Sequence, residues 1–407
     1  MNCRHCHTPL TRQFLDLGSA PPSNAYLATE DLRRPEMHYP LRLFVCEACR
    51  LVQTEDFASA DTFFSADYAY FSSTSKGWLA HARAYSETMT HRFGLGADSF
   101  VVEVASNDGY LLRNFVAAAI PCLGIEPTDS TADAAEAQGV PTLRAFFGRE
   151  LGERLAAEGR AADLIAGNNV YAHVPDINDF TAGLAAALKP QGVVTLEFPH
   201  LMRLVEFHQF DTVYHEHFSY LSLLVVARIF AAHGLRVFDV EELPTHGGSL
   251  RVFGCRTDAA HQETPAVTAL LAEEHRRGMA EDAFYAGFQT QADAVKDGLL
   301  RFLLDCKARG RRVAGYGAAA KGNTLLNYAG VRPDLLPFVC DAAPAKIGRY
   351  LPGSRIPVLA PQALRDHRPD VVLILPWNIA AEVRAQLDDL ARKGTRFAAA
   401  VPEMHET

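Results

Sequence analysis

No stretch of this sequence approaches the roughly 20 consecutive apolar residues that a membrane-spanning helix needs. The N-terminal segment MNCRHCHTPL also lacks an apolar region behind its basic residues, so it does not indicate a secretory signal. Basic residues are in deficit, because 39 Lys and Arg stand against 48 Asp and Glu for a formal net charge of −9. This balance offers no electrostatic attraction for nucleic acid or an anionic membrane surface. We therefore expect a soluble, cytoplasmic protein without nucleic-acid or membrane partners.

The composition is that of a folded protein with more than one domain. Hydrophobic residues make up 48% of the chain and charged residues 21%, and no repeat or low-complexity tract is present. A length of 407 residues corresponds to two or three domains. We predict a small Cys- and Pro-punctuated module over residues 1–58, a first α/β domain over 59–257 and a second α/β domain over 258–407.

Apolar runs alternate with helical patterns in both predicted α/β domains. Runs of this kind, bounded by turn residues, indicate buried parallel strands. The run 246–254 is expected to be a late strand that closes the first series, and the amphipathic segment 262–309 to form one or two connecting helices. The predicted strands of the two series are 99–105, 121–126, 162–168 and 192–198, and then 311–317, 335–341 and 370–377.

Four of the eight cysteines form two CxxC pairs, Cys3 with Cys6 and Cys46 with Cys49. Two such pairs supply four thiolates for a tetrahedral Zn²⁺ site, which favours structural zinc. Redox-active dithiols or two disulfides are the alternatives. A site with four thiolates has no open position, so this metal is expected to stabilise the module and not to catalyse. The remaining cysteines are expected to be small buried hydrophobic residues, namely Cys122, Cys255, Cys306 and Cys340.

The segment VVEVASNDGYLL runs from an apolar strand through a loop into a helix, and the acidic strand end Glu126 follows about 20 residues later. The loop has one glycine and no basic residue for a diphosphate, which favours a nucleoside with a cationic sulfonium over a dinucleotide. An ordinary Rossmann turn is the alternative. The pattern resembles the first motif of class I S-adenosylmethionine-dependent methyltransferases, and LIAGNNVYAHVPD resembles their later strand beside the methionine part of the cofactor. The residues that this resemblance assigns to the cofactor are Glu103, Ser106, Asn107, Asp108, Gly109, Glu126, Asn168 and Asn169.

Histidines and tyrosines are densest in the segment TVYHEHFSYLS, residues 212–222. Methyl transfer to carbon needs a base with a pKa near the working pH and hydrogen-bond donors for the developing oxyanion. Histidine can supply the base, and tyrosine or a second histidine the donors. Structural histidines or a metal site are the alternatives.

A second glycine-containing loop, RRVAGYGAAAKGNTLLN, carries G-x-G-x-x-A at Gly315, Gly317 and Ala320. Asp341 at the next strand end is a candidate ribose ligand. Lys321, Asn323 and the helix N-terminus also suit a diphosphate. The loop could therefore bind NAD or the diphosphate of a nucleotide-linked substrate, and we favour the substrate because the first loop already serves a cofactor.

Taken together, the motifs resemble those of sugar C-methyltransferases that act on nucleotide-linked 4-keto-deoxysugars. The resemblance covers the whole chain: the cysteine module, SADYAYFSSTS, EVASNDGYLL, GIEPT, YHEHFSY, HGGSLR, GYGAAAKGNTLLN and LPWN. It implies an α/β protein with a small N-terminal zinc-binding module, a central class I methyltransferase domain and a C-terminal Rossmann-like domain that binds the nucleotide-sugar. The implied cofactors are S-adenosylmethionine and Zn²⁺.

The same resemblance implies roles for individual residues. His217 would remove the proton at C3, next to the C4 ketone, with Tyr214 and Glu216 as positioning or proton-transfer partners. The other polar residues that would line the active site are Tyr68 and His173, and those that would bind the nucleotide-sugar are Lys321, Asn323, Tyr316 and Asn378. The expected partner is a small dTDP-, GDP- or CDP-linked sugar, and a monomer is the working expectation. An NAD-dependent nucleotide-sugar oxidoreductase or epimerase is the alternative enzyme, and a zinc-ribbon nucleic-acid-binding protein is the non-catalytic one.

Overall fold

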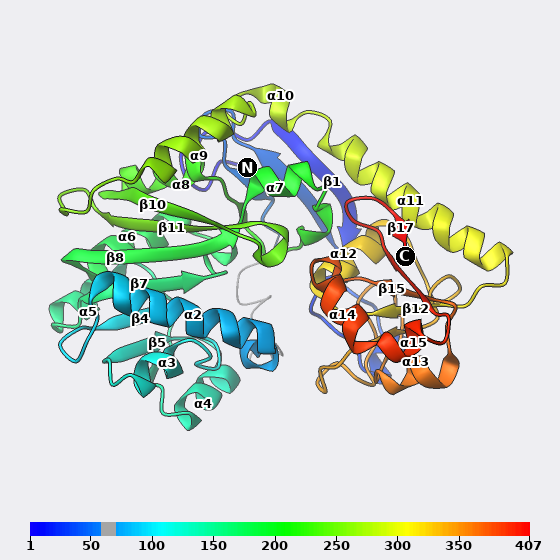
Figure 1. Ribbon diagram of the computed structural model, residues 1–407. Helices are drawn as coiled ribbons and strands as arrows, with labels where there is room; N and C mark the ends of the chain where they lie inside the picture. The colour runs from blue at the N-terminus through cyan, green and yellow to red at the C-terminus, as the bar shows by residue number, and fades with distance from the viewer. Residues whose placement is uncertain (58–70) are drawn as a thin grey trace.

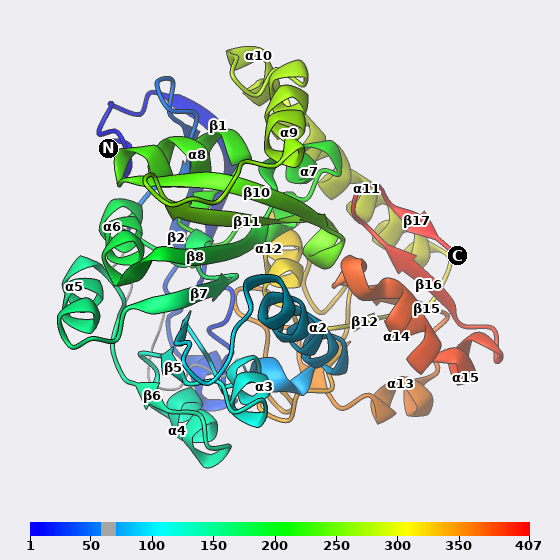
Figure 2. The same ribbon diagram turned by 60° about the vertical axis from the view of Figure 1, so that its left-hand side comes forward.

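The protein forms two lobes that a long helix connects (Figure 1). The computed structural model describes residues 1–57 and 71–407. The larger lobe carries a seven-stranded sheet and the smaller lobe a six-stranded sheet. A four-stranded N-terminal sheet lies toward their junction, where strand β1 (Arg12–Ala20) and helix α11 (Phe288–Ala308) run from one lobe to the other (Figures 1 and 2).

The N-terminal sheet includes a strand from the middle of the chain. Its antiparallel order is β1, β2 (Tyr39–Val45), β3 (Val52–Thr54) and β9 (Ser219–Tyr220). Val52 pairs with Tyr220 and Gln53 with Ser219. The histidine- and tyrosine-rich segment is therefore attached by backbone pairing to the N-terminal module.

The seven-stranded sheet is parallel over five strands and has one reversed strand near an edge. β4 to β8 run parallel, whereas β11 runs antiparallel to both β8 and β10. Because the carboxyl ends of parallel strands share one edge, loops that are distant in sequence meet there. In spatial order the strands are β10 (Leu235–Leu243), β11 (Ser249–Arg256), β8 (Leu188–Pro199), β7 (Ala162–Asn168), β4 (Val101–Val104), β5 (Cys122–Ile125) and β6 (Thr142–Leu143).

Helices cover both faces of this sheet because successive strand residues point to opposite sides. Val101 packs in a core with α2 and α3, whereas Val102 packs in the core that contains α5, α6 and α8. The helices of this lobe are η2 (Ser72–Thr74), α2 (Lys76–Phe93), α3 (Leu112–Ala117), α4 (Asp129–Ala137), α5 (Arg149–Ala157), η3 (Tyr171–His173), α6 (Ile177–Ala187), α7 (Leu201–Glu206), η4 (Phe210–Thr212), α8 (Leu223–Ala232) and η5 (Thr245–Gly247).

The predicted closing strand differs in its placement. Residues 246–248 belong to a tight turn, and β11 begins at Ser249 and is inserted between β8 and β10. β10 was not predicted, because its polar positions, such as Asp239 and Glu241, interrupt the apolar run.

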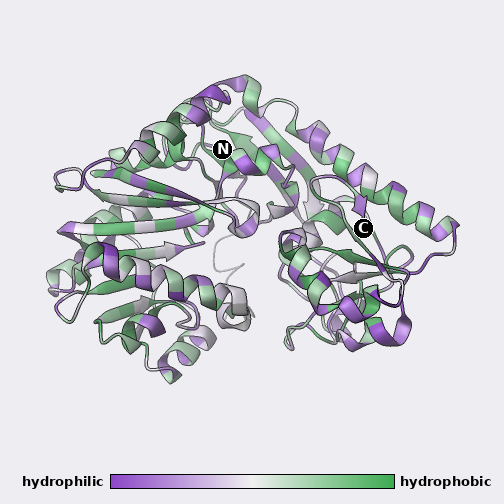
Figure 3. Cartoon of the chain, in the orientation of Figure 1, coloured by the Kyte–Doolittle hydropathy of each residue, from purple (hydrophilic) through white to green (hydrophobic). Residues whose placement is uncertain are grey.

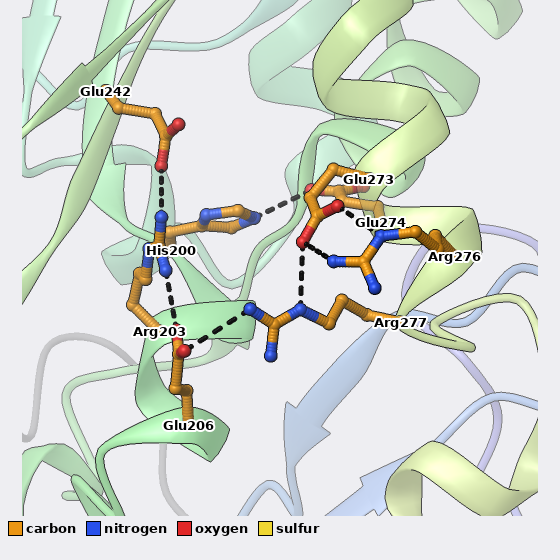
Figure 4. Close-up of polar contacts among 8 residues, drawn as sticks. All are labelled: His200, Arg203, Glu206, Glu242, Glu273, Glu274, Arg276 and Arg277. Atoms are coloured by element: carbon orange, nitrogen blue, oxygen red, sulfur yellow. Dashed lines mark hydrogen bonds and ion pairs between the residues drawn. The ribbon is translucent and has the colours of Figure 1, made fainter.

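The connecting segment forms α9 (Pro265–Arg276), the short α10 (Asp282–Tyr285) and the 21-residue α11. On α9, buried Glu274 accepts hydrogen bonds from His200 Nε2 (2.7 Å) and from the backbone N–H groups of Leu223 and Leu224 (2.8 and 2.7 Å). Glu274 thus satisfies the first N–H groups of α8 and holds α9 on the larger lobe (Figure 4). On α11 the buried positions recur every three or four residues: Phe288, Ala292, Val295, Leu299, Leu303 and Cys306.

The six-stranded sheet is doubly wound, since five strands are parallel and the last is antiparallel. Its spatial order is β14 (Val358–Leu359), β13 (Val339–Cys340), β12 (Val313–Tyr316), β15 (Val371–Ile374), β16 (Arg396–Ala399) and β17 (His405–Glu406). The helices of this lobe are α12 (Ala320–Tyr328), α13 (Gln362–His367), η6 (Trp377–Ile379), α14 (Ala380–Gln386) and α15 (Asp388–Ala391), and η1 (Glu30–Arg33) precedes β2.

Hydropathy follows this architecture. The strands inside both lobes are largely hydrophobic, whereas the outer faces of α11 and α15 are hydrophilic (Figure 3). Across the described ranges, no helix has the length and apolar character to cross a bilayer.

Candidate active site

The first glycine-containing loop follows β4 in a strained backbone conformation. Ala105, Asn107 and Gly109 all have positive φ, at 57°, 50° and 75°. The Glu126 carboxylate holds the loop, because it accepts hydrogen bonds from the N–H groups of Asn107 and Thr128, each at 2.9 Å. Strain of this kind persists only where surrounding contacts enforce it, and it concentrates at binding sites.

Buried polar atoms without partners surround this loop. Among the described residues, the Ser106 hydroxyl and both amide atoms of Asn168 have no hydrogen-bond partner. Burial also raises the pKa of Glu103 well above its usual range. Buried polar groups are normally paired, so a ligand that carries hydroxyl and amino groups and a positive charge fits these residues. S-Adenosylmethionine is such a ligand.

The segment after residue 70 docks on the same loop. The N–H of Ser72 donates to Asn107 Oδ1 (2.9 Å) and the N–H of Ser73 to Asp108 Oδ2 (3.1 Å). Tyr68, predicted to line the active site, lies outside the described residues.

His217 lies at the centre of an aromatic cluster. Its Nδ1 is 2.9 Å from the Thr212 carbonyl oxygen, and its ring centroid lies 3.9 Å from that of Tyr214 and 4.5 Å from that of His173. Only Nδ1–H can donate to that carbonyl, so Nε2 carries the lone pair. Burial lowers the pKa of His217 well below its usual range, and the neighbouring His173 lowers it further. The imidazole is therefore neutral at pH 7.

His173 and Glu216 complete this side of the site. His173 Nδ1 donates to the Glu216 carbonyl oxygen at 2.8 Å, and burial lowers the pKa of His173 to about 4. Glu216 Oε1 accepts a hydrogen bond from Asn24 Nδ2 (3.2 Å), whereas Oε2 has no partner among the described residues. Burial raises the pKa of Glu216.

A second group of aromatic side chains lies beside Asn169. His246 Nε2 is 3.3 Å from Asn169 Nδ2, and the Trp78 ring lies 5.5 Å from the His246 ring and stacks on His81 at 4.8 Å. His81 in turn bonds to buried Glu197 at 2.9 Å. Neither His81 nor His246 was assigned to the site from the sequence, although a histidine before two glycines in HGG was a usable signal.

The smaller lobe contributes Lys321 and its neighbours. Lys321 Nζ donates to Asn378 Oδ1 (2.8 Å) and lies 4.6 Å above the Trp377 ring. Burial lowers the pKa of Lys321, while Asp211 opposes this. Lys321 also contributes to the low pKa values of His217 and His246. The lobes meet at the site, since Trp377 Nε1 donates to Asp211 Oδ2 at 2.7 Å.

The two other residues predicted to bind substrate have partners within the protein. Tyr316 packs in the core beneath α13–α15, and its hydroxyl donates to Gln386 Oε1 at 3.2 Å. Asn323 is 1% exposed and donates to the Ser23 carbonyl at 2.7 Å. The structure thus brings Lys321 and Asn378 together and places Tyr316 in a core away from them. Asn323 lies beside Thr324, whose hydroxyl donates to the Val213 carbonyl, and its Oδ1 has no hydrogen-bond partner among the described residues.

The four paired cysteines converge as predicted. Their sulfur atoms all lie within 4.8 Å of one another, and all four cysteines are free of disulfides. The two CxxC turns are alike: the N–H of His7 donates to Cys3 O (3.0 Å), that of Arg50 donates to Cys46 O (2.9 Å), and both residues have positive φ. Four convergent sulfurs fit Zn²⁺, which Cys3, Cys6, Cys46 and Cys49 would hold.

Known proteins match all three parts of this chain. Residues 3–64 match a model described as "Putative zinc binding domain", residues 78–240 one described as "Methyltransferase domain", and residues 244–402 one described as "C-methyltransferase C-terminal domain". The chain is 36% identical to C-methyltransferase NovU of Streptomyces niveus over 401 residues, which are 98% of this chain and 95% of NovU. The chain belongs to the C-methyltransferase family. The family resemblance and the three-part α/β fold predicted from sequence are confirmed, with S-adenosylmethionine and zinc as cofactors.

Two solved structures each match about half of the chain. A methyltransferase in complex with the Trm112 activator from Haloferax volcanii is 14% identical, with a TM-score of 0.38, and the match covers 50% of this chain and 99% of that one. Magnesium protoporphyrin IX methyltransferase ChlM from Synechocystis PCC 6803 is 12% identical, with a TM-score of 0.35, and the match covers 44% of this chain and 80% of that one.

Proposed function

We propose that the protein methylates a carbon next to the C4 ketone of a nucleotide-linked 4-keto-6-deoxysugar, with C3 as the predicted position. The observation that carries this proposal is the hydrogen bond between His217 Nδ1 and the Thr212 carbonyl oxygen (2.9 Å). It keeps the ring proton on Nδ1 and leaves Nε2 as a base of fixed orientation.

Carbon becomes a nucleophile toward a methyl group only after it loses a proton, and an adjacent ketone makes that loss feasible. S-Adenosylmethionine supplies an electrophilic methyl group when it is bound. His217 would take the proton on Nε2, since its lowered pKa keeps it unprotonated at neutral pH. Tyr214, whose ring centroid lies 3.9 Å from that of the base, and Glu216, whose raised pKa favours the protonated acid, would position the sugar.

The cofactor would lie at the carboxyl ends of β4, β5 and β7. Glu126 is proposed to accept hydrogen bonds from the ribose, since each carboxylate oxygen that holds the loop retains a lone pair. Asn168 ends the neighbouring strand β7 and Asn169 follows it, beside the predicted methionine portion. Holding the methyl group close to the acceptor carbon then contributes to the rate through proximity.

The nucleotide-sugar would bind between the lobes, with its diphosphate at Lys321 and Asn378. Lys321 is the cation that contributes to the low pKa of His217, so an anion bound there would lie near the base. The chemistry of this pair suits dTDP-, GDP- and CDP-linked sugars equally, because all three carry a diphosphate.

The alternative of an NAD-dependent oxidoreductase finds less support. Asp341 Oδ2 accepts a hydrogen bond from the Ala318 N–H at 2.7 Å, and Lys346 and Tyr26 both donate to the Ala318 carbonyl. A carboxylate therefore takes the loop N–H that a dinucleotide phosphate would need.

Mass spectrometry in deuterated water would test the proposal. The purified protein would be incubated with a panel of nucleotide-linked 4-keto sugars, with and without S-adenosylmethionine. We expect a gain of one methyl group with the cofactor and deuterium uptake next to the ketone without it. NMR of the product would then assign the carbon, and a methyl group on C5 would contradict the predicted position but not the reaction class.

His217→Asn is expected to abolish both signals and to leave S-adenosylhomocysteine binding intact. A matched control is His261→Asn, because the half-buried His261 bonds to the Gln191 carbonyl (3.0 Å) at the opposite edge of the sheet. Methylation within about tenfold of wild type in His217→Asn would show that His217 is not the sole base.

A further inference from the structure

The turn between β10 and β11 contains three consecutive residues in the left-handed region. His246, Gly247 and Gly248 have φ of 56°, 87° and 116°. Glycine adopts such values readily, whereas a histidine there is strained. Strained non-glycine residues at a candidate site justify a search for their role.

Surrounding groups fix this turn on both sides. A Cβ on Gly247 would lie 2.3 Å from Trp377 Cη2, and one on Gly248 would lie 2.7 Å from Arg203 Cγ. Gln209 Nε2 donates to the Gly247 carbonyl at 2.8 Å, and the His200 N–H donates to the Gly248 carbonyl at 3.0 Å. The clamping contacts therefore run through the glycines and not through the imidazole.

Arg203 is itself held in place (Figure 4). Its guanidinium pairs with Glu206 at 2.6 Å and with Glu242 at 2.8 Å, and Glu206 is shared with Arg277 at 3.4 Å. These contacts fix the backbone of the turn, whereas the His246 ring has its own contacts with Asn169 (3.3 Å) and Trp78 (ring centroids 5.5 Å apart).

The His246 ring is placed where the two halves of the site meet. Asn169, predicted to contact the cofactor, lies on one side, with its Nδ2 3.3 Å from His246 Nε2. Trp377, which packs beneath Lys321, lies against the next residue of the turn. His246 also contributes to the low pKa of His217.

The contact with Asn169 also determines which nitrogen carries the proton. An amide Nδ2 donates, so His246 Nε2 accepts and the ring proton lies on Nδ1. Nδ1 has no hydrogen-bond partner among the described residues. The charged and titratable groups that affect the ring are Lys321, Glu197 and His81, and with burial they lower the pKa of His246 to about 4.

We propose that His246 is a further catalytic residue, whose neutral Nδ1–H donates a hydrogen bond to the sugar oxygen that becomes the enolate. This inference rests on the proposed function. Such a donor stabilises charge that develops only in the transition state, and loss of one typically lowers the rate by about 10² to 10³. His217 and His246 would then divide the chemistry, one taking the proton from carbon and the other stabilising the oxygen.

Replacement of His246 by glycine separates this role from a structural one. His246→Gly removes the imidazole and relieves the backbone strain, so the melting temperature is expected to stay the same or rise. Deuterium exchange without S-adenosylmethionine and methylation with it are both expected to fall at least 100-fold. Affinity for S-adenosylhomocysteine is expected to change less than threefold.

Two further variants sharpen the experiment. His208 is also a histidine in the left-handed region, with φ of 52°, and its ring contacts the Pro402 carbonyl at 3.2 Å. His208→Gly is expected to leave both rates within twofold of wild type. Asparagine tolerates the same left-handed backbone and retains an N–H donor. We therefore expect His246→Asn to exchange deuterium at least ten times faster than His246→Gly.

Four outcomes would overturn the proposal. If deuterium exchange persists while methylation is lost, His246 acts on S-adenosylmethionine and not on the enolate. Rates within threefold of wild type, or a loss that follows a lower melting temperature, would leave the residue a structural role. Wild-type protein that neither exchanges nor methylates any sugar would instead refute the proposed function, and His246 would have no enolate to stabilise.

Discussion

The indole N–H of Trp377 donates to Asp211 Oδ2 at 2.7 Å, and this bond joins the smaller lobe to the loop that orients His217. Thr212, the next residue, provides the carbonyl that fixes the imidazole. Thr324 of α12 adds a second anchor, because its hydroxyl donates to the Val213 carbonyl at 2.7 Å. Alignment of the base therefore depends on docking of the C-terminal domain.

Trp377→Phe removes this hydrogen bond and retains an aromatic ring beneath Lys321. We expect kcat for methylation to fall about tenfold and KM to change less than threefold. The reason is that the substitution loosens the loop that orients His217 but leaves the proposed substrate contact at Lys321 in place. Steady-state kinetics with the 4-keto sugar would measure this. Tyr285→Phe is a matched control, since it removes another buried 2.7 Å bond, to the Met279 carbonyl, far from the loop. A rise in KM alone would assign Trp377 to substrate binding instead.

The raised pKa of Asp211 predicts that the stability of the folded protein depends on pH. Asp211 is fully buried, and burial raises its pKa from 3.8 to about 6, although Lys321 opposes this. The folded state holds a proton that the unfolded state releases, so stability from this group is present below pH 3.8 and is lost as pH rises through about 6. Asparagine mimics the protonated form at every pH.

Asp211→Asn is therefore expected to gain stability relative to wild type as pH rises. The shift of about 2 pH units corresponds to about 3 kcal/mol between pH 4 and pH 7. Urea unfolding of both proteins at several pH values would measure it. If the free energy of unfolding of Asp211→Asn relative to that of wild type stays constant or falls with rising pH, the pKa of Asp211 is not raised.

Much of the fold follows from the sequence, because the buried parallel strands are continuous apolar runs. VVEV, CLGI and VVLI each form a strand inside the predicted range. The paired cysteines were equally clear, since spacing alone brings each pair together. β9 could not be foreseen, because a two-residue strand is defined only by its pairing with β3, which lies in the distant N-terminal module.

The candidate site was predicted less completely for a related reason. His217 and Lys321 stand out in motifs, but Asp211, Trp377 and His246 act through contacts between distant segments. Tyr316 was also predicted from its motif, and strand alternation places its side chain in the core beneath α13–α15. Periodicity identifies faces of a strand but not which face a neighbouring lobe covers.

Zinc is expected to affect catalysis through the backbone. Gln53 Nε2 donates to Cys3 Sγ at 3.3 Å, and the next residue, Thr54, donates from its N–H to the Phe218 carbonyl (3.1 Å) and from its hydroxyl to the His217 carbonyl (3.2 Å). Metal removal with a chelator is thus expected to lower both the melting temperature and the exchange rate. Differential scanning calorimetry and the exchange assay would measure these effects.

Thr54→Val separates the effect of the zinc module on stability from its effect on the exchange rate. It leaves the cysteines and the backbone pairing in place but removes the hydroxyl contact to the base's own carbonyl. We expect unchanged zinc content, measured by atomic emission, and a several-fold lower exchange rate. Unchanged exchange in both Thr54→Val and the metal-free protein would show that the zinc module acts independently of the site.

Gly109 makes a prediction about cofactor affinity. It lies in the loop after β4 at φ 75°, and a Cβ there would lie 3.0 Å from Val140 Cγ2 and 3.2 Å from Ala135 Cβ. Alanine would therefore be strained and crowded at once, and the loop would have to move away from α4. Because the neighbouring N–H of Asn107 bonds to Glu126, such a movement would also disturb the proposed ribose ligand. We expect Gly109→Ala to weaken S-adenosylhomocysteine binding at least tenfold by calorimetry.

Gly139 provides the matched control, because it has nearly the same φ, 79°, and a Cβ there would meet nothing within 4 Å. Gly139→Ala incurs the backbone strain without the crowding, and it lies outside the loop. It should lower the melting temperature while leaving S-adenosylhomocysteine affinity within twofold of wild type. Equal losses of affinity in the two variants would mean that general destabilisation, and not displacement of the loop, weakens binding, and the assignment of this loop to the cofactor would lose its support.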